Sequence, residues 1–453
     1  MTDTFLDPLR AQLRAIPRAR HVGQITALGR DHVRVAGLDR IAALGDRVRI
    51  GPDLRGEILK LDDTGCTVMP EGATDGVRLG LPVMHLGPAG ISPDHSWLGR
   101  VVDPDGQPMD GKPLFPGSRS YPLRAAPPSP AERRALGPRL QTGFAVFDTL
   151  LPIVRGQRVG LFSGSGVGKS SLIGAMAKAM SADVVVIGLI GERGRELRDF
   201  VADTLGPEGL ARSVVVAATS DRPALTRARA AWSMMAVAEY FRDQGLQVLL
   251  LADSITRFAE AQRDVAAAAG EPCGPSGFPA SMAQMVMGLV ERAGPGAQGQ
   301  GDITAVLSVL VAGSDMEGPV ADVMRGVLDG HVVLARAIAE RGRYPAIDLL
   351  RSVSRALPRA ASADEVTLIA RARQLLGAYE RAELMVQAGL YSPGNDPVTD
   401  AAIAAWPGLD AFVASAASGS IEDSFTALRG ILETTDPVLK QARRATGGQM
   451  AAG

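Results

Sequence analysis

One stretch of eight residues constrains this chain more than any other, because glycines, a lysine and a serine stand in it at fixed offsets. It reads Ser163-Gly164-Ser165-Gly166-Val167-Gly168-Lys169-Ser170. The apolar segment 158–162 before it predicts a strand, and the segment 171–180 after it has a helical pattern. Strand, glycine-rich turn, Gly-Lys-Ser and helix in this order are the context of a phosphate-binding P-loop.

The residues of this loop suit phosphate for a physical reason. Glycines let consecutive backbone N–H groups curl around an anion, and the N-terminus of the helix adds the positive end of its dipole. Lys169 is predicted to reach the β- and γ-phosphates, and the Ser170 hydroxyl to hold Mg²⁺. We therefore predict a nucleotide-binding protein. Its predicted nucleotide contacts here are Gly164, Ser165, Gly166, Val167, Gly168, Lys169, Ser170 and Ser171.

Length and composition set the broad class. With 453 residues the chain can bury the cores of roughly two or three domains. A net charge of −1 provides no global attraction to nucleic acid or to an anionic membrane, and the histidines and cysteines show no metal-ligand spacing. No apolar run approaches the length of a membrane span, and the N-terminus lacks a signal layout. We therefore expect a cytoplasmic protein, which could still dock on a membrane.

The first residues predict a short amphipathic helix, 4–16, with apolar side chains on one face and arginines on another. Three interpretations compete: a helix packed on its own core, a partner-binding helix, and a helix lying on a lipid surface. We favour partner binding because so short a leading segment has little core of its own.

From about residue 20 to 92 the pattern changes to short alternating runs separated by Gly, Asp and Pro, which predicts a small β-barrel. This stretch contains no Phe, Tyr or Trp, so it lacks the aromatic platforms of barrels that bind nucleic acid. Nothing in it resembles a catalytic site. The candidate strands are 24–28, 32–35, 46–50, 56–61 and 66–69.

Beyond the P-loop, apolar strand candidates alternate with helical patterns. This alternation predicts a doubly wound, mainly parallel α/β sheet with nucleotide at the carboxyl ends of its strands. The predicted strands are 184–190, 214–217, 248–252, 303–311 and 331–334, and the predicted helices are 224–241, 256–269 and 281–292. From about residue 358 the pattern is helical and rich in Ala, and predicts a helical C-terminal domain. Its predicted breaks are Gly389, Pro393, Pro397 and Pro407.

Two of these strands end in carboxylates that suit phosphoryl transfer. The run 248–252 leads into Asp253, which suits a Walker-B carboxylate that orients Mg²⁺, although a strand-terminal Asp can also cap a helix. Glu192 follows the strand 184–190 and could polarise the attacking water, while Arg193 could steady the γ-phosphate. An acid at a helix start in a salt bridge would explain the same spacing, so both interpretations stay open here.

Five motifs then occur in one order: SGSGVGKS, IGERGRE, LLLADSITRFAEAQRD, RGVLDGHVVLAR and RYPAIDLLRSVSR. In this order they resemble the flagellar export and type III secretion ATPases, most of all the flagellum-specific type, which are relatives of the catalytic subunits of rotary ATP synthases. The resemblance runs from roughly Leu98 to Ile403 and implies a P-loop RecA-like core. The implied domains are a partner-binding helix, a β-barrel, the ATPase domain and the helical domain, over 1–18, 19–92, 93–357 and 358–453.

The resemblance also implies roles that spacing cannot supply. Glu192 matches the catalytic glutamate and Asp253 the Walker-B aspartate, which with Ser170 serves Mg²⁺. Arg355 matches an arginine finger that a neighbouring subunit inserts into the site, which implies a ring, most simply a homohexamer. Tyr344 matches an aromatic residue near the adenine. Tyr391 is a second candidate for this position, with packing in an ordinary core as the competing interpretation.

The function implied is ATP hydrolysis that energises export of flagellar subunits. The implied partners are a coiled-coil regulatory protein bound by the N-terminal helix, the export gate and chaperone–cargo complexes, with peripheral contact at the inner membrane and no nucleic acid. The injectisome ATPase of a virulence system shares every motif and remains the near alternative. A hexameric RNA helicase and a ring subunit without catalysis are alternatives of other classes.

Four positions depart from the family pattern. Ser163 stands where Ala or Gly is common, which is a mild change. Gly288 replaces a usual basic residue, Glu260 a usually apolar residue and Arg351 a usually small one. These three leave the nucleotide chemistry intact and bear on pore or subunit contacts.

Overall fold

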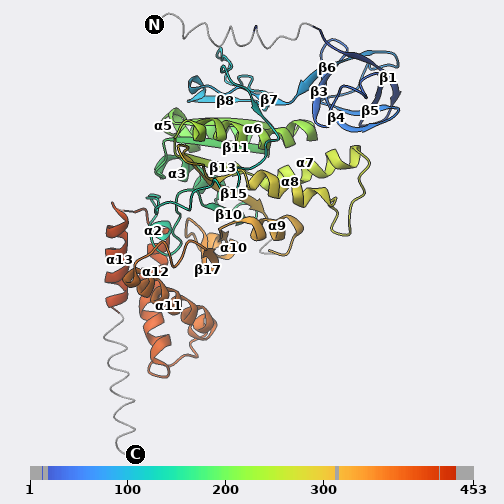
Figure 1. Cartoon of the computed structure of the whole chain (residues 1–453). Coiled ribbons are helices and arrows are strands. Elements are labelled where there is room, and N and C mark those ends of the chain that lie inside the picture. The colour runs from blue at the N-terminus through green and yellow to red at the C-terminus, as the bar shows by residue number, and fades with distance from the viewer. Residues whose placement is uncertain (1–12, 14–18, 312–315, 418, 435–453) are drawn as a thin grey trace, which may run out of the picture.

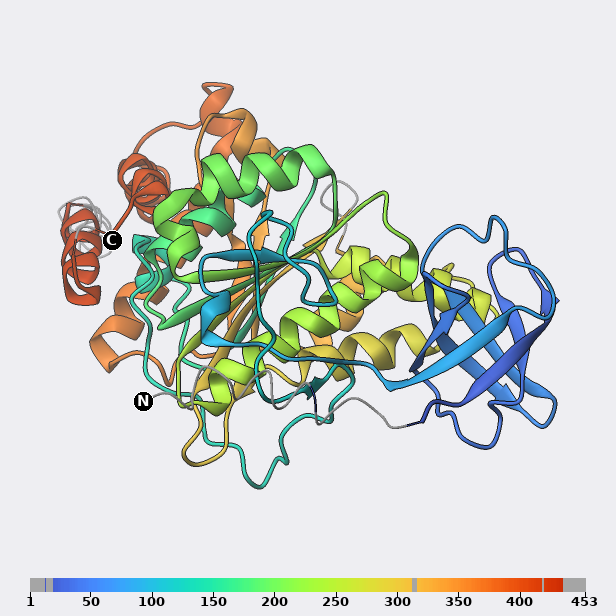
Figure 2. The same ribbon diagram turned by 90° about the horizontal axis from the view of Figure 1, so that it is seen from above.

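The computed structural model describes residues 13, 19–311, 316–417 and 419–434. A small barrel and a group of helices lie at opposite ends of an α/β core, as Figures 1 and 2 both show. The predicted helix 4–16 lies outside the described residues except for Leu13, which is exposed. The architecture confirms the predicted fold class, an α/β core with a barrel before it and helices after it.

Six of the described strands close into the predicted barrel, in the order β1-β2-β5-β4-β3-β6. Alternate side chains such as Val33, Val35 and Val48 are buried inside it, as the period-two pattern requires. The sequence did not predict β6, because its prolines and glycine read as a loop; it forms by pairing with both β1 and β3. The strands are β1 (Val22–Leu28), β2 (Val33–Ala36), β3 (Asp46–Ile50), β4 (Leu54–Asp62), β5 (Gly65–Pro70) and β6 (Pro82–Pro88).

Nine strands of the described chain form the central sheet, in the order β17-β16-β10-β15-β13-β11-β12-β8, with β14 paired to β15 off this path. Most pairs are parallel, but β17 runs antiparallel to β16 and was not predicted. The small sheet β7-β9 lies apart. The strands are β7 (Gly90–Ile91), β8 (Arg100–Val102), β9 (Tyr121–Pro122), β10 (Arg158–Ser163), β11 (Val184–Glu192), β12 (Ser213–Thr219), β13 (Val248–Asp253), β14 (Gly294–Pro295), β15 (Asp302–Leu310), β16 (Gly330–Leu334) and β17 (Ile347–Ser354).

Helices cover both faces of this sheet, which is why its strands are apolar on both sides. Along β11, Val186 and Ile190 pack toward α6–α9, whereas Val185 and Leu189 pack toward α2, α3 and the C-terminal helices. The helices are η1 (His95–Trp97), α2 (Ala145–Asp148), α3 (Lys169–Ala179), α4 (Gly194–Asp199), η2 (Phe200–Leu205), α5 (Gly206–Ala211), α6 (Ala224–Asp243), α7 (Ile255–Ala268), α8 (Ser281–Val290), α9 (Pro319–Val327) and α10 (Arg336–Glu340).

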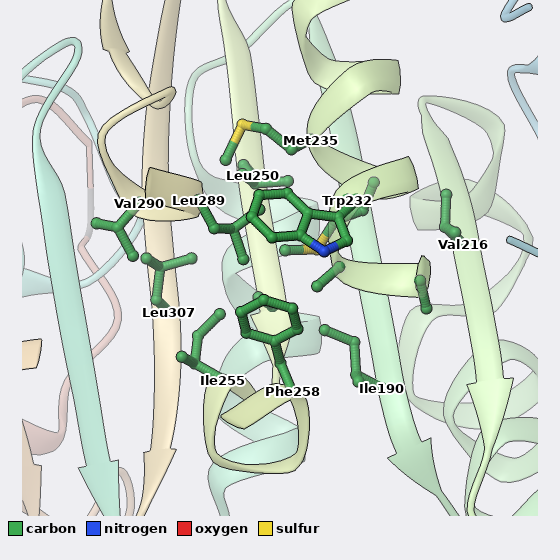
Figure 3. Close-up of a cluster of buried hydrophobic side chains, with 14 of the residues drawn as sticks. Ile190, Val216, Trp232, Met235, Leu250, Ile255, Phe258, Leu289, Val290 and Leu307 are labelled. Carbon is green, nitrogen blue, oxygen red and sulfur yellow. The ribbon is translucent and has the colours of Figure 1, made fainter. Parts of the chain in front are cut away.

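The larger side chains of the first face meet between α6, α7 and the sheet. Trp232 on α6 and Phe258 on α7 pack edge to face, with ring centroids 5.3 Å apart. Figure 3 shows both rings among the aliphatic side chains of β11, β13 and α8. This cluster fixes α7, which begins at Ile255 with Ser254, the residue after Asp253, as its N-cap.

Three helices of the described region form the C-terminal part: α11 (Ala363–Gln387), α12 (Pro397–Ala414) and α13 (Ile421–Glu433). Ser362 and Glu365 form a capping box at the start of α11. Of the predicted breaks, Pro397 begins α12, but Pro407 lies inside it, so that prediction was wrong. Buried side chains on both sides of Pro407, including Ala405 and Leu409, hold α12 together across the missing hydrogen bond.

A buried arginine joins the barrel to the core. Arg229 on α6 is 2% exposed and contacts Glu57 and Glu71 of the barrel side and Asp105 of the core, at 3.2, 2.6 and 3.4 Å. Burial opposes the charge of Arg229, but the three carboxylates outweigh it and raise the pKa of the guanidinium. The same carboxylates also pair with Arg47, Arg55 and Arg124. The described helices include none that is long and apolar enough to cross a membrane.

Candidate nucleotide site

The P-loop leaves the carboxyl end of β10 and enters α3. Gly166 and Gly168 have φ of +77° and +82°, a backbone conformation that favours glycine and that turns the loop over the helix N-terminus. Val167 points inward and is buried, which anchors the loop, while Ser165 and Ser170 stay exposed. Because α3 begins at Lys169, the backbone N–H groups of its first turn face the loop.

Lys169 and Asp253 meet at the carboxyl edge of the sheet. The Lys169 ammonium contacts Asp253 Oδ1. Lys169 begins the helix that follows β10, Asp253 ends β13, and β15 lies between these two strands. Ser308 on β15 donates a hydrogen bond of 2.8 Å to the same carboxylate oxygen. Asp253 is thereby held between a cation and a hydroxyl while it is almost fully buried.

Glu192 ends the next strand, β11, and lines a cleft of about 220 Å³ together with Ser170, Glu196 and Asp253. Burial of its carboxyl raises the pKa of Glu192 to about 7, and the charge of Asp253 adds to the effect, while Lys169 opposes it. A carboxyl with a pKa near neutrality can exchange a proton at physiological pH, as a general base requires.

Arg193 follows Glu192 but turns outward. Its side chain is 81% exposed and pairs with Glu196 at 3.6 Å on the surface of α4. Arg193 does not line the cleft. The structure thus leaves its predicted contact with a γ-phosphate without support from geometry.

Tyr344 lies against the other side of the P-loop. A Cβ atom built on Gly168 would lie 3.1 Å from Tyr344 Cδ1, so the ring sits directly beside the loop. Tyr344 is 52% exposed and lines a mainly apolar cavity of about 640 Å³ with Phe144, Pro345 and Ala414. An exposed aromatic ring next to an apolar cavity suits stacking on an adenine.

Tyr391 does not join this cavity. It lies in the loop before α12, and its hydroxyl donates to Asp400 Oδ1 at 2.9 Å and to the Asp396 carbonyl at 3.1 Å. The opposite end of α12 carries Ala414 of the cavity, and an 18-residue helix spans roughly 27 Å. The structure gives Tyr391 a role in the α11–α12 loop.

Arg355 lies at the edge of the sheet opposite its own P-loop. Because β17 runs antiparallel to β16, its last residue, Ser354, pairs with Gly330. The Arg355 backbone N–H then bonds to the Asp329 carbonyl at 3.0 Å, beside the start of β10. The length of β10, roughly 17 Å at its usual rise, separates this point from the P-loop. Arg355 is exposed there and faces away from its own site.

The residues present fit Mg²⁺ bound with a nucleotide. The Ser170 hydroxyl and the Asp253 carboxylate lie in one cleft, and hard oxygen ligands of this kind suit Mg²⁺. Among the described residues no cluster of three or more His, Cys, Asp or Glu side chains could hold a metal by itself. A Mg²⁺ ion here would therefore need phosphate oxygens and waters, as is usual for this ion.

Residues 143–354 match the model of the ATP synthase alpha/beta family nucleotide-binding domain, and residues 361–429 match the T3SS EscN ATPase C-terminal domain. The flagellum-specific ATP synthase of Caulobacter vibrioides is 44% identical over 412 residues, covering 88% of this chain and 92% of the relative. The chain belongs to the flagellar and type III secretion ATPases.

Other relatives span both branches of these ATPases. The flagellum-specific ATP synthase of Salmonella typhimurium is 40% identical and covers 95% of this chain and 98% of its own. The type 3 secretion system ATPase of Xanthomonas euvesicatoria is 42% identical, covering 87% and 90%. The assembled ATPase EscN of enteropathogenic E. coli superposes with a TM-score of 0.83 at 36% identity over 90% of this chain and 100% of its own. A further structure holds EscN with its central stalk EscO.

Sequence reasoning missed several residues of this ATPase's site. Ser308 carried no signal beyond being a polar residue in an apolar strand, because its contact with Asp253 depends on strand order. Phe144 and Ala414 come from distant segments that meet where α2 packs against α12, beside the bridge between Phe144 and Ala416.

The four departures from the family pattern lie in different surroundings in this ATPase. The Ser163 hydroxyl is buried at the start of the P-loop and has no hydrogen-bond partner in the described part of the chain. Glu260 pairs with Arg257 at 2.9 Å on α7, and Arg351 pairs with Asp348 at 3.5 Å on β17. At Gly288 on α8 an added side chain would meet nothing within 4 Å.

Proposed function

We propose that this ATPase hydrolyses Mg²⁺-ATP to energise the export of flagellar proteins through a type III apparatus, by releasing chaperones from cargo and assisting its unfolding and entry. The observation that carries the proposal is that Asp253 and Glu192 line one cleft with Ser170 of the P-loop, while Lys169 contacts Asp253. This arrangement supplies a phosphate-binding cation, a carboxylate for Mg²⁺ and a base that titrates near neutrality.

Each of these residues takes a definite part in the proposed reaction. The loop Gly164–Ser171 and Lys169 bind the phosphates, and Ser170 and Asp253 hold Mg²⁺, which supplies charge stabilisation on the phosphates when bound. Glu192 accepts the proton of the attacking water. Tyr344 stacks on the adenine. The Arg193 side chain points to solvent. We therefore propose that it contacts the phosphates only when the cleft closes.

We propose that Arg355 completes the site of a neighbouring chain in a homohexamer. Its place at the opposite sheet edge supports action in trans, since it cannot reach its own P-loop. Such a finger is worth about 10³–10⁵ in rate, or roughly 4–7 kcal/mol of barrier.

Mixing two inactive variants tests the trans site. Lys169→Ala retains the finger and Arg355→Ala retains the P-loop, so in mixed rings about a quarter of the sites combine an intact loop with an intact neighbouring finger. Recovery of ATP hydrolysis on mixing is the expected result. If the mixtures are as inactive as their components, the trans role of Arg355 is contradicted, while the proposed P-loop chemistry is unaffected.

The flagellar role is favoured over the injectisome role because several curated relatives at 40–44% identity are named flagellum-specific. In the source bacterium, deletion of the gene is expected to abolish filament assembly, and Glu192→Gln to fail in restoring it. Intact filaments together with loss of effector secretion would establish the injectisome ATPase instead.

The partners follow from the same proposal. Residues 1–18 bind a coiled-coil regulatory protein, and the assembly works on the cytoplasmic side of the inner membrane beside the export gate and chaperone–cargo complexes. Removal of residues 1–18 is expected to abolish binding of the coiled-coil partner while basal ATP hydrolysis persists. Stimulation of hydrolysis by RNA would instead support a helicase, which the absence of aromatic residues in the barrel speaks against.

A further inference from the structure

Arg355 rests on the C-terminal end of α9. Its Nη1 donates to the Leu328 carbonyl at 3.0 Å and its Nη2 to the Arg325 carbonyl at 3.3 Å. Carbonyls at the end of a helix carry partial negative charge and bind a cation favourably. The guanidinium is therefore aimed by the main chain of one short turn, Arg325–Asp329.

An ion pair holds the segment Arg325–Asp329 against β10. Arg158 donates to Asp329 Oδ2 from its backbone N–H and from Nε, both at 3.0 Å, and to Oδ1 from Nη2 at 3.2 Å. The Asp329 backbone N–H donates back to the Arg158 carbonyl at 2.8 Å. The two side chains are only 14% and 26% exposed, so solvent screens this fork-like pair weakly.

A buried glutamine links the segment Arg325–Asp329 to the end of β17. Gln157, which is fully buried, donates from Nε2 to the Asp329 carbonyl at 3.0 Å and to Ser354 Oγ at 3.3 Å. It thus ties the residue before Arg355 to the turn on which the guanidinium rests. None of these groups lies near the chain's own P-loop, because β10 separates the two edges of the sheet.

We propose that Arg158 and Asp329 form a positioning pair that holds Arg355 in the orientation required by the neighbouring chain's site. This inference rests on the proposed trans role of Arg355. Arg158 also pairs with Glu291 at 2.7 Å, a contact that Asp329→Asn leaves in place. The Arg158–Asp329 pair touches no nucleotide and acts on the neighbouring site through Arg355, so its loss misplaces the guanidinium while the P-loop of the same chain stays intact. A misplacement of about 1 Å can cost on the order of 100-fold in rate.

The test is Asp329→Asn, which keeps the shape of the side chain and removes its charge. A finger acts in the transition state, so kcat is expected to fall roughly 10- to 100-fold with KM for ATP changed less than about twofold. Glu340→Gln is the matched control, because it removes a carboxylate from an exposed pair with Arg336 and is expected to leave kcat unchanged.

Two further readouts separate positioning from a general structural role. Mixing Asp329→Asn with Lys169→Ala is expected to restore hydrolysis, since the Lys169→Ala chain supplies an intact finger to the intact P-loop of the Asp329→Asn chain. On an Arg355→Ala background, Asp329→Asn is expected to cost nothing more, because both changes act on the same finger.

The possible outcomes distinguish the positioning pair from the trans role of Arg355 on which it rests. If Arg355→Ala is rescued by Lys169→Ala but Asp329→Asn is not, or if Asp329→Asn keeps full kcat, the positioning pair is overturned and the trans finger stands. If Arg355→Ala itself is not rescued, the trans role of Arg355 is contradicted, and the positioning pair with it. Should Asp329→Asn fail to fold, Arg158→Lys keeps the charge and loses the fork, and the same outcomes apply to it.

Discussion

The raised pKa of Glu192 makes the pH dependence of this ATPase a sharp test of its site. The carboxyl is partly buried next to Asp253, and its pKa rises from 4.5 to about 7. A general base works only when it is deprotonated. The rate constant kcat/KM reports the ionisation of the free enzyme and is therefore expected to rise with pH through about 7.

The size of the effect follows from proton occupancy. With a pKa of about 7, roughly one-eleventh of Glu192 is ionised at pH 6 and ten-elevenths at pH 8, so kcat/KM increases about tenfold over this interval. With the ordinary value of 4.5 the carboxyl would be about 97% ionised at pH 6, and kcat/KM would change by only a few per cent.

A single substitution moves the midpoint in a known direction. Glu196 raises the pKa of Glu192 both through a side-chain hydrogen bond and through its charge. Glu196→Gln is therefore expected to shift the midpoint of kcat/KM to lower pH. Glu208→Gln on α5 removes an exposed carboxylate that does not line the cleft, and should leave the midpoint in place.

The assay is steady-state phosphate release between pH 5.5 and 8.5, roughly one and a half units to either side of the expected midpoint, with Mg²⁺ in excess and protein concentration held constant. A profile that changes less than about twofold between pH 6 and 8, in an enzyme that Glu192→Gln inactivates, would refute the argument from burial. A midpoint that rises in Glu196→Gln would refute the assigned cause of the shift.

Further outcomes follow from other contacts. Tyr344→Ala should raise KM for ATP roughly 5- to 150-fold, since stacking on a base is worth about 1–3 kcal/mol, whereas Tyr391→Ala should leave KM unchanged. Phe258→Ala should cost about 3–5 kcal/mol of unfolding free energy in urea titrations. Arg229→Met should cost at most about 3–5 kcal/mol at pH 7, because three carboxylates lose their most buried cation but keep contacts with Arg124, Arg47 and Arg55. The pKa of Asp105 is lowered in the folded chain, so its stabilisation is present at neutral pH and lost on acidification. The Arg229→Met difference should therefore shrink at low pH.

Much of the candidate nucleotide site was predictable because its chemistry is local. The left-handed glycines, Lys169 and Ser170 lie within a few consecutive residues, and their order alone implies a strand, a turn and a helix N-terminus. The strands ending at Asp253 and Glu192 were recognisable as apolar runs followed by a carboxylate. Parallel strands bring such ends to one edge, so their meeting could be expected before the sheet order was known.

Other features depended on contacts between distant segments. The strand β6 carries prolines and a glycine, and it exists only because two barrel strands pair with it. Pro407 lies within α12 because packing on the core outweighs the hydrogen bond that it removes. Local propensity points the other way in both cases, and tertiary packing decides.

The sequence by itself determined which groups are predicted to bind phosphate, since the backbone conformation and charge needed for this are encoded in neighbouring residues. Only the tertiary structure decided that Ser308 holds Asp253, that Tyr344 rather than Tyr391 lies by the P-loop, and that Arg355 faces away from its own site. These placements follow from strand order, register and the antiparallel direction of β17. They are set by the free energy of packing the whole sheet, which no short segment carries.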